Sequence, residues 1–229
     1  MITIITSIQN NFIKNIRKLH TKKERYNTHT FLIEGFHLIE EALKSKWSIE
    51  HVIIKEGIHV PAWYGDLPIT YVSERVFAHI SQTETPQGIA GVVKMKEEVI
   101  HEEHTHILLI DAVQDPGNLG TIIRTADAAG FSQVVLGKGT VDLYNDKVIR
   151  ATQGSLFHID IQQDNNLEET IPKLQEDGFT VYASALEDAK PYKEIAKQEK
   201  VALILGNEGA GISNSVLEAA DERIHIPIY

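Results

Sequence analysis

The chain has 229 residues, of which 42% are hydrophobic, and a formal net charge of −10 at pH 7. This length suits one large or two modest domains, each with a proper hydrophobic core. The absence of cysteine excludes disulfides, thiolate metal sites and a cysteine nucleophile. The sequence has neither an apolar run of about 18 residues nor the pattern of a secretory leader, so we expect a cytoplasmic protein.

Positive charge is concentrated near the N-terminus, although the whole chain is acidic. Residues 1–30 contain one acidic residue, Glu24, and six basic residues: Lys14, Arg17, Lys18, Lys22, Lys23 and Arg25. A local patch of this kind can contact nucleic-acid phosphates even when the average charge is negative. A solvated basic helix face is the alternative, and the charge run alone favours it.

The first hundred residues alternate between helical and strand patterns. Ile8, Phe12, Ile16 and Leu19 recur at spacings of three and four, which predicts an amphipathic helix whose other face is basic. After this basic helix region, residues 1–27, we expect strands over 28–33, 51–54, 69–72 and 89–95, and helices over 35–46 and 73–79. Residues 28–96 are therefore predicted to form a small α/β sandwich.

Residues 97–105, EEVIHEEHT, lack regular apolar spacing, and we place a linker there. Around it lie three histidines and two glutamates that invite a metal site: His101, Glu102, Glu103, His104 and His106. The ligand spacing of known zinc motifs is missing, so we expect no metal.

The segment Ile107–Gly130 joins a buried strand, a turn and a helix without a break. Residues 107–110 are apolar throughout, 115–118 are turn formers, and the apolar residues that follow recur at helical spacing as far as Gly130. A strand, a tight turn and a helix in this order place polar side chains at the carboxyl edge of a sheet, where open α/β folds bind ligands.

A similar pattern follows a second strand, Val201–Leu205, with glycines at 206, 209 and 211 and a helix over 215–220 that Ser213 is placed to cap. Between and after these segments we expect strands over 134–136, 156–161, 179–183 and 223–229, and helices over 147–153 and 167–176. Such alternation predicts a mainly parallel sheet with helices on both faces, over residues 106–229.

Three ordered motifs resemble those of the SpoU (TrmH) family of RNA ribose 2′-O-methyltransferases. The first is N-x-G-x-x-x-R-x-A-x-x-x-G from Asn118 to Gly130, the second is Gly206-Asn207-Glu208 with Gly211, and the third is Ile226-Pro227. Two separated motifs in the right order are far more specific than one glycine loop. The first hundred residues resemble the substrate-binding domain of the ribosomal RNA branch of this family, which is similar to a ribosomal RNA-binding protein.

The resemblance implies an S-adenosylmethionine-dependent enzyme that methylates ribose 2′-hydroxyls, with ribosomal RNA as the expected substrate. It also implies a trefoil knot of the SPOUT type in the C-terminal domain and a homodimer formed through that domain. The open alternatives are transfer RNA as substrate, a non-catalytic RNA-binding or ribosome assembly factor, and a small-molecule nucleotide-binding protein. Against the last, the sequence has no dinucleotide or P-loop motif.

The site residues are carried over from the matching motifs. The resemblance implies three catalytic residues, Arg124, Asn118 and Glu208, and six cofactor-binding residues, Gly206, Asn207, Gly209, Gly211, Ile226 and Pro227. A guanidinium is a poor base, so we expect Arg124 to hold the target phosphate and stabilise the developing alkoxide. The alternatives are that Asn118 caps a helix and that Arg124 and Glu208 form an ion pair.

Two further residues are weaker candidates. Arg150, followed by Gln153 and Gly154, lies where the family carries a basic residue that faces the RNA, though a surface charge is the alternative. Asp111 ends the first catalytic strand and is a candidate for binding a ribose, but a turn-forming aspartate is commoner.

The third motif departs from the family pattern. In the family, Ile-Pro is followed by a Ser-Leu-Asn segment and a final helix, whereas this sequence stops at Tyr229. The resemblance therefore implies that the catalytic domain is cut short, either because a tail is omitted from the chain or because part of the site is lacking.

Overall fold

The computed structural model describes residues 3–59, 64–65, 67–96 and 104–227. The chain divides into two compact units, one made of residues 1–97 and 144–157, the other of residues 98–143 and 158–229. The expected linker, 97–105, and its histidine–glutamate run lie outside the described residues as far as position 103. Within the described part of the chain, no helix combines the length and apolar character that crossing a membrane requires.

The N-terminal unit is built on a five-stranded sheet in the order β1-β4-β3-β5-β2. β5 is antiparallel to β2 and β3, and the other pairs are parallel. The strands are β1 (Ile4–Ile5), β2 (Thr30–Glu34), β3 (Ile49–Lys55), β4 (Ile69–Val72) and β5 (Ile89–Lys94). The helices are α1 (Asn11–Lys18), α2 (Lys22–Thr28), α3 (Phe36–Lys44), α4 (Glu74–Ile80) and the later α6 (Asp146–Thr152).

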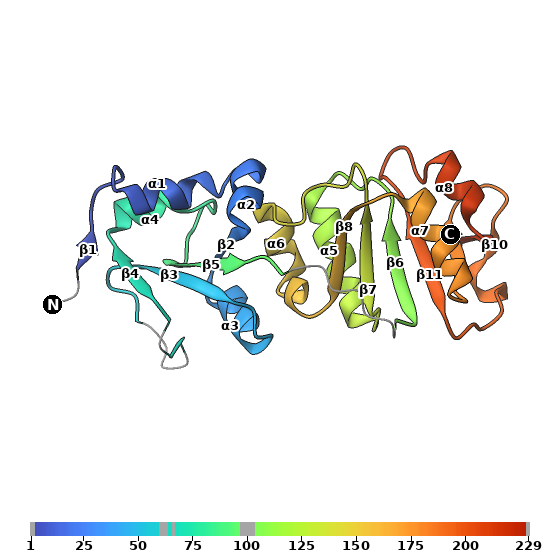
Figure 1. Ribbon diagram of the computed structural model, residues 1–229, viewed down its shortest axis with the longest axis horizontal. Coiled ribbons are helices and arrows are strands. Elements are labelled where there is room, and N and C mark those ends of the chain that lie inside the picture. The colour runs from blue at the N-terminus through green and yellow to red at the C-terminus, as the bar shows by residue number, and fades with distance from the viewer. Residues whose placement is uncertain (1–2, 60–63, 66, 97–103, 228–229) are drawn as a thin grey trace. The chain divides into compact units, whose positions relative to one another are not determined.

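Helices cover both faces of this sheet, which confirms the expected sandwich (Figure 1). α1 and α4 bury Ile13, Ile16 and Phe77 against one face. α3 packs on the other face at Gly91, where an added Cβ would lie only 3.3 Å from Ile33 and 3.4 Å from Ile39. A glycine here lets a helix approach the strand closely.

Helix α2 was not expected, and the strand predicted from Thr28 begins instead at Thr30. The side chain of Thr21 accepts from the amide of Glu24 at 3.4 Å, and His29 ends the helix in the left-handed conformation with φ 51°. The sequence of α2, KKERYNT, has no apolar stripe, so hydrophobic periodicity does not reveal it.

The C-terminal unit is built on a seven-stranded sheet in the order β10-β12-β9-β11-β6-β7-β8, and all of its pairs are parallel. Its strands are β6 (His106–Ile110), β7 (Gln133–Gly137), β8 (Asp160–Asn165), β9 (Thr180–Ser184), β10 (Lys190–Pro191), β11 (Val201–Leu205) and β12 (Glu222–His225). Its helices are α5 (Pro116–Ala128), α7 (Leu167–Glu176) and α8 (Asn214–Ala219), with a 3₁₀ turn η3 at Tyr192–Glu194. The predicted parallel sheet is confirmed.

All strands of this sheet run the same way, but the side on which the chain adds them changes at β6. The chain runs from β6 to β7 and β8 on one side, and then returns to β9, β11 and β12 on the other. Because parallel crossovers are right-handed, helices on the two arms cover opposite faces. α7 and α8 accordingly bury Ile171 and Val216 against Leu109 and Ile204, a cluster that contains no residue of α5.

Three local expectations were wrong. The strand predicted over 156–161 begins at Asp160, because Ser155–Phe157 forms a 3₁₀ turn, η2, that packs in the N-terminal unit; the indole Nε1 of Trp47 donates to the carbonyl of Phe157 at 3.1 Å. Ser213 precedes α8, but its side chain makes no capping hydrogen bond. The last strand ends at His225, before Ile226-Pro227.

Candidate active site

The candidate site lies where strands β6 and β11 end side by side. Leu205 of β11 pairs with Ile110 of β6, and the amide of Asp111 donates to the carbonyl of Leu205 at 2.8 Å. The order in which the chain adds strands to the sheet reverses at β6, so the loops that follow β6 and β11 lead to helices on opposite faces. Such switch points are where open α/β sheets bind ligands.

Glu208 joins these two loops. One carboxylate oxygen, Oε1, accepts from the amide of Asp115 and from Nδ2 of Asn118, both at 3.1 Å, and Oε2 accepts from the amide of Gln114 at 3.3 Å. Hydrogen bonds from its own backbone amide, from Asn118 and from the other two amides lower the pKa of the Glu208 carboxyl. The ionised carboxylate thus holds the glycine loop to the start of α5.

The expected cap of α5 is corrected by the same geometry. The helix begins at Pro116, inside the predicted turn, and the side chain of Asp115 is the cap because it accepts from the amide of Asn118 at 2.8 Å. The alternative of Asn118 as the cap is therefore wrong, and its side chain is directed to Glu208 instead.

Asn207 sets the shape of the glycine loop. Its Oδ1 accepts from the amides of Gly209 and Ala210, both at 2.9 Å, and its Nδ2 donates to the carbonyl of Ala112 at 2.8 Å. Ala112 has φ 54°, a left-handed conformation that is unusual for alanine. The loop after β11 therefore holds a strained residue of the loop after β6 in place.

Gly206 is required by the packing of the loop on itself. A Cβ at this position would lie 2.4 Å from the carbonyl carbon of Gly211 and 2.4 Å from the amide nitrogen of Ile212. Gly211 itself has φ 71°, which favours glycine. These two glycines are needed for the loop to close, whatever the loop binds.

Asp111 has a structural partner within the loop cluster. Its side chain is only 9% exposed, and Oδ2 accepts from the amide of Ser213 at 2.7 Å. This bond joins the end of β6 to the residue before α8. A buried, engaged carboxylate does not support the ribose-binding role considered for Asp111.

A cavity of about 680 Å³ opens beside the glycine loop. It is lined by residues 184–187 after β9, 209–212 of the glycine loop, Asn214, Leu217 and Glu218 of α8, and 223–226 at the end of β12. Gly209, Gly211 and Ile226 therefore share one cavity, while Gly206, Asn207 and Pro227 are not among its lining residues. The segments 184–187 and 223–225 were missed, although their position at strand ends is the signal that parallel-sheet geometry offers.

The chemistry of this cavity suits a cation that carries a flat apolar group. Two large apolar side chains at its wall remain uncovered, since Leu186 is 90% and Ile226 71% exposed. Two carboxylates, of Glu187 and Glu218, line it against one guanidinium, that of Arg223. S-adenosylmethionine combines an adenine ring with a net positive charge at neutral pH, and the cavity's volume is in the range of small-molecule sites, so the residues fit this group.

Arg124 stands apart from this network. It is exposed on α5, and within the described part of the chain its side chain has no hydrogen bond or ion pair, so the structure does not contain the alternative ion pair with Glu208. Six helical positions separate it from Asn118, which places the two side chains roughly 120° apart around the helix axis. Asn118 and Glu208 are thus brought together, and Arg124 is left facing solvent.

The basic residues of the N-terminal unit divide into two groups. Five are exposed: Lys14, Arg17, Lys18, Lys22 and Lys23. Arg25 is only 6% exposed and donates from Nη1 to the carbonyl of Leu19 at 2.9 Å. The burial of Arg25 does not support its predicted contact with RNA, because its guanidinium holds the chain between α1 and α2.

Arg150 lies on α6 in the N-terminal unit, and its Nη1 donates to the carboxylate of Asp146 at 2.6 Å. Its side chain is 34% exposed. Among the residues whose positions are described, no group of three or more metal-ligating side chains is found.

A parallel α/β domain with a cavity beside its glycine loop, together with an α/β sandwich that carries five exposed basic residues, is typical of a two-domain protein that binds a cofactor and a larger substrate. Residues 105–229 match the SpoU rRNA Methylase family, and residues 10–91 match the MRM3-like substrate binding domain. The chain belongs to the SpoU rRNA methylase family.

Two rRNA methyltransferases match along nearly the whole chain, and a tRNA modifying enzyme matches about half of it. The 23S rRNA (guanosine(2553)-2′-O)-methyltransferase RlmP of Bacillus subtilis is 48% identical over 226 residues, which cover 98% of this chain and 90% of that protein. An AdoMet-bound rRNA methyltransferase from Sinorhizobium meliloti is 33% identical, with a TM-score of 0.88 over 100% of this chain and 90% of that one. The match to the A. aeolicus TrmH/SpoU tRNA modifying enzyme, 26% identical with a TM-score of 0.50, covers only 56% of this chain and 64% of that enzyme's chain.

These findings confirm the predicted class of activity. The chain is an RNA 2′-O-methyltransferase whose cofactor is S-adenosylmethionine.

Proposed function

We propose that this enzyme methylates the ribose 2′-hydroxyl of a guanosine in 23S ribosomal RNA. The observation that carries the proposal is the 48% identity to RlmP, which extends over both units of the chain. A transfer RNA substrate is less well supported, because the tRNA modifying enzyme matches only 56% of this chain. The five exposed basic residues around α1 and α2 supply a surface for RNA phosphates.

We place the cofactor in the cavity beside the glycine loop. Gly209, Gly211 and Ile226 would contact it directly, while Gly206 and Asn207 fix the conformation of the loop without lining the cavity. S-adenosylmethionine supplies an electrophilic methyl group on a positively charged sulfur. The net negative charge of the cavity lining favours a positively charged ligand over a neutral one.

The residues of α5 act on the RNA side of the reaction. The guanidinium of Arg124, which has no partner among the described residues, is available for a bidentate contact with the phosphate next to the target ribose and stabilises negative charge on the 2′-oxygen. A guanidinium does not itself accept a proton at neutral pH. Glu208 and Asn118 keep the glycine loop in position against α5.

We propose further that the enzyme is a homodimer formed through the C-terminal unit and that its last segment is knotted, as the family resemblance implies. The uncovered Leu186 and Ile226 beside the cavity, and the insertion of β12 between β9 and β10, support this arrangement. Light scattering coupled to size exclusion should give twice the mass of 25.7 kDa. A monomeric mass at micromolar concentration would contradict the dimer.

Transfer of tritiated methyl groups from S-adenosylmethionine tests the function. With 23S rRNA from cells that lack the enzyme we expect incorporation at one guanosine, mapped as a block to alkaline hydrolysis after that nucleotide, and none with transfer RNA. Calorimetric titration of the cofactor into the chain, and into a chain extended beyond Tyr229 by the end of the Bacillus relative, separates binding from turnover. Cofactor binding without transfer to any RNA would refute the function, and transfer to transfer RNA alone would refute the substrate.

A further inference from the structure

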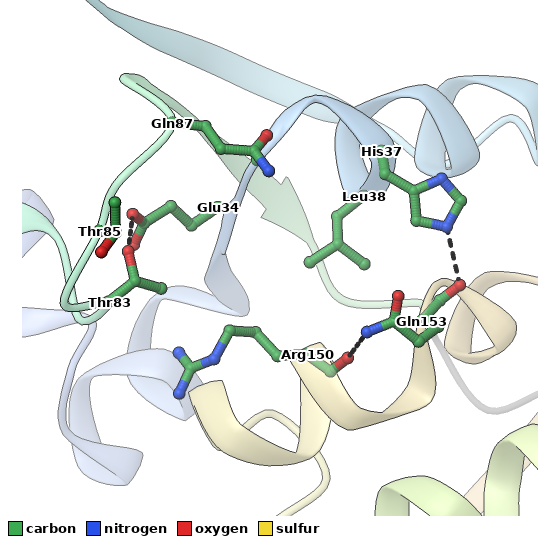
Figure 2. Close-up of a pocket in the computed structure, with 9 residues that line it drawn as sticks. Glu34, His37, Leu38, Thr83, Thr85, Gln87, Arg150 and Gln153 are labelled. Atoms are coloured by element: carbon green, nitrogen blue, oxygen red, sulfur yellow. Dashed lines mark hydrogen bonds between the residues drawn. The ribbon is translucent and has the colours of Figure 1, made fainter.

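A second cavity lies within the N-terminal unit. It has a volume of about 190 Å³ and lies between the loop 83–87, the start of α3 and the end of α6 (Figure 2). We call it the Arg150 groove; its polar lining includes Glu34, His37, Gln87, Arg150 and Gln153.

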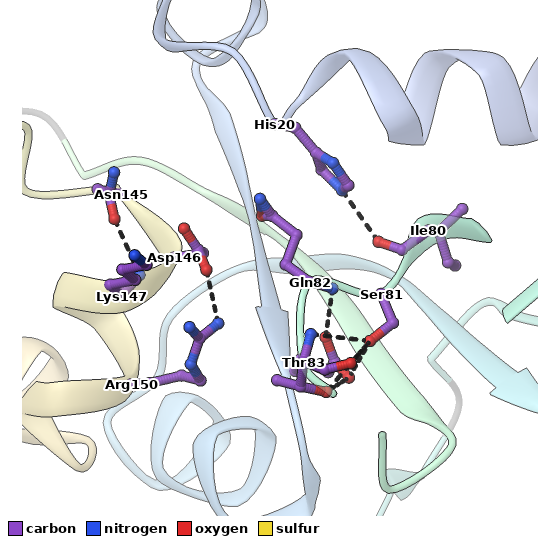
Figure 3. Close-up of polar contacts among 10 residues, drawn as sticks. His20, Ile80, Ser81, Gln82, Thr83, Asn145, Asp146, Lys147 and Arg150 are labelled. Carbon is purple, nitrogen blue, oxygen red and sulfur yellow. Dashed lines mark hydrogen bonds and ion pairs between the residues drawn. The ribbon is translucent and has the colours of Figure 1, made fainter. Parts of the chain in front are cut away.

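The walls of the groove are held by side-chain hydrogen bonds. The carboxylate of Glu34 accepts from the hydroxyls of Ser81 at 2.7 Å and Thr83 at 2.6 Å, and from the amide of Gln82 at 3.2 Å, which fixes the loop that follows α4 (Figure 3). Oε1 of Gln87 accepts from the amide of Phe36 at 3.0 Å. One wall is therefore built in place before anything binds.

The other wall is fixed equally well. Nε2 of His37 is hydrogen-bonded to the carbonyl of Gln153 at 3.0 Å, and a Cβ at Gly154 would lie 2.9 Å from Cγ of Glu41. The end of α6 is thus in close contact with α3. A pre-formed pocket loses little entropy when a ligand enters it.

Several hydrogen-bonding groups of the groove are unused within the described residues. The side-chain donor Nε2 of Gln87 has no partner there. The side chain of Gln153 donates from Nε2 to the carbonyl of Arg150 at 2.8 Å, and its acceptor Oε1 has no partner among the described residues. Arg150 donates from Nη1 to Asp146, and its other guanidinium N–H groups have no partner among the described residues. A ligand would therefore meet one amide donor, one amide acceptor and a guanidinium.

The floor of the groove is apolar and the charges of its lining balance. Leu38 lines it, and Leu32 and Ile149 line a smaller neighbouring cavity that shares Glu34, Leu38 and Arg150 with the groove. The two charged side chains of the lining, Glu34 and Arg150, carry opposite charges. With Glu34 beside Arg150 the groove offers no excess positive charge for a phosphate, whereas an uncharged flat ring with donors and acceptors on its edge matches both floor and walls.

We propose that the Arg150 groove binds an unstacked nucleobase of the RNA substrate and so selects the site of methylation. Single-stranded RNA is commonly read through splayed bases whose edges are hydrogen-bonded by the protein. His20, which follows the basic helix α1, interacts electrostatically with Asp146, and Asp146 is paired with Arg150 of the groove (Figure 3). Phosphates on α1 and a base in the groove can therefore belong to one RNA segment. The inference rests on the proposed function, since it requires RNA as substrate.

Two substitutions remove the unused groups and keep the hydrogen bonds of His37 and of the Phe36 amide that hold the walls, while Gln153→Gly also removes the bond from Nε2 of Gln153 to the carbonyl of Arg150. Gln153→Gly deletes the side-chain amide and suits the left-handed backbone there, where φ is 50°. Gln87→Glu keeps an oxygen to accept from the amide of Phe36 but replaces the donor by a charged acceptor. Gln9→Glu, at an exposed position outside the groove, makes the same change of charge and is the matched control.

Binding of 23S rRNA fragments and base-specific chemical probing give the readout. We expect each groove variant to raise the RNA dissociation constant about three- to tenfold, to expose one base that the wild type protects, and to leave cofactor affinity and melting temperature unchanged. Gln153→Gly should keep the wild-type slope of log K against log salt, because it removes no charge. Wild-type affinity and protection in both groove variants would overturn the proposal.

A reduction of the slope by about 0.7 in Arg150→Gln would also overturn it, since it would show that the guanidinium of the groove neutralises a phosphate. Failure of the proposed function is distinguishable, because it would appear as an absence of methyl transfer in the wild-type enzyme. Failure of the groove proposal alone would leave wild-type transfer intact and the variants equal to it.

Discussion

Nδ2 of Asn118 donates to Oε1 of Glu208 at 3.1 Å, although 90 positions separate the two residues in the chain. This bond joins the first and second family motifs directly. The amides of Gln114 and Asp115, just after β6, also donate to the carboxylate of Glu208. The glycine loop beside the proposed cofactor cavity is therefore attached to the helix that carries Arg124.

The attachment should respond to pH. Because the folded pKa of Glu208 lies below its ordinary value of 4.5, its contribution to the free energy of unfolding is present above pH 4.5 and is lost as the pH falls through the folded pKa. Glu208→Gln should melt lower than the wild type at pH 7, and the difference should shrink below pH 4.5. The exposed Glu199→Gln is the control, and equal melting temperatures of Glu208→Gln and wild type at pH 7 would contradict the role.

Gly206 and Gly209 offer a matched pair in the same loop. Gly206→Ala forces a Cβ against backbone atoms at 2.4 Å, whereas a Cβ at Gly209 lies 3.7 Å from its nearest neighbour, Oδ1 of Asn207. We expect Gly206→Ala to destabilise the protein by about 1–3 kcal/mol and to abolish cofactor binding measured by calorimetry. Gly209→Ala should keep the wild-type melting temperature, and equal effects of the two would show that the loop relaxes freely.

Arg124 should affect turnover without affecting the fold. Since its side chain has no hydrogen bond or ion pair among the described residues, Arg124→Ala should keep the melting temperature and the cofactor dissociation constant while lowering methyl transfer about 100-fold or more. Arg124→Lys should recover only part of this activity, because an ammonium does not offer a bidentate fork. Single-turnover assays with saturating RNA measure the step, and wild-type rates in Arg124→Ala would exclude the residue from catalysis.

Substitution of the exposed basic residues should weaken RNA binding, whereas substitution of the buried Arg25 should lower stability. The double variant Lys14→Gln with Lys23→Gln should weaken RNA binding and reduce the salt slope by about 0.7 for each phosphate that the protein no longer neutralises, with no change in melting temperature. Arg25→Gln should instead destabilise the protein by about 1–3 kcal/mol, since a buried guanidinium bonded to Leu19 is removed. RNA titrations at several salt concentrations and thermal melts distinguish the two classes, and a stable Arg25→Gln with weakened RNA binding would reverse the assignment.

Most elements of the fold were accessible from local patterns. The strand Val201–Leu205 and the helix Leu167–Glu176 have the predicted bounds, because continuous apolar runs and helical spacing are local consequences of burial. Local patterns failed for α2, which has no apolar face, and for Ser155–Phe157, whose apolar side chains are buried in the other unit rather than in a strand.

The sequence by itself determined the family, because its motifs are short, ordered and specific enough to name Asn118, Arg124 and Glu208 as the residues to test. Only the tertiary structure decided what those residues touch. Sheet order brings β11 beside β6 and so joins Glu208 to α5, and packing buries Arg25 while it leaves Arg124 exposed. These outcomes depend on contacts between segments far apart in the chain, and no periodicity within one segment encodes its neighbour.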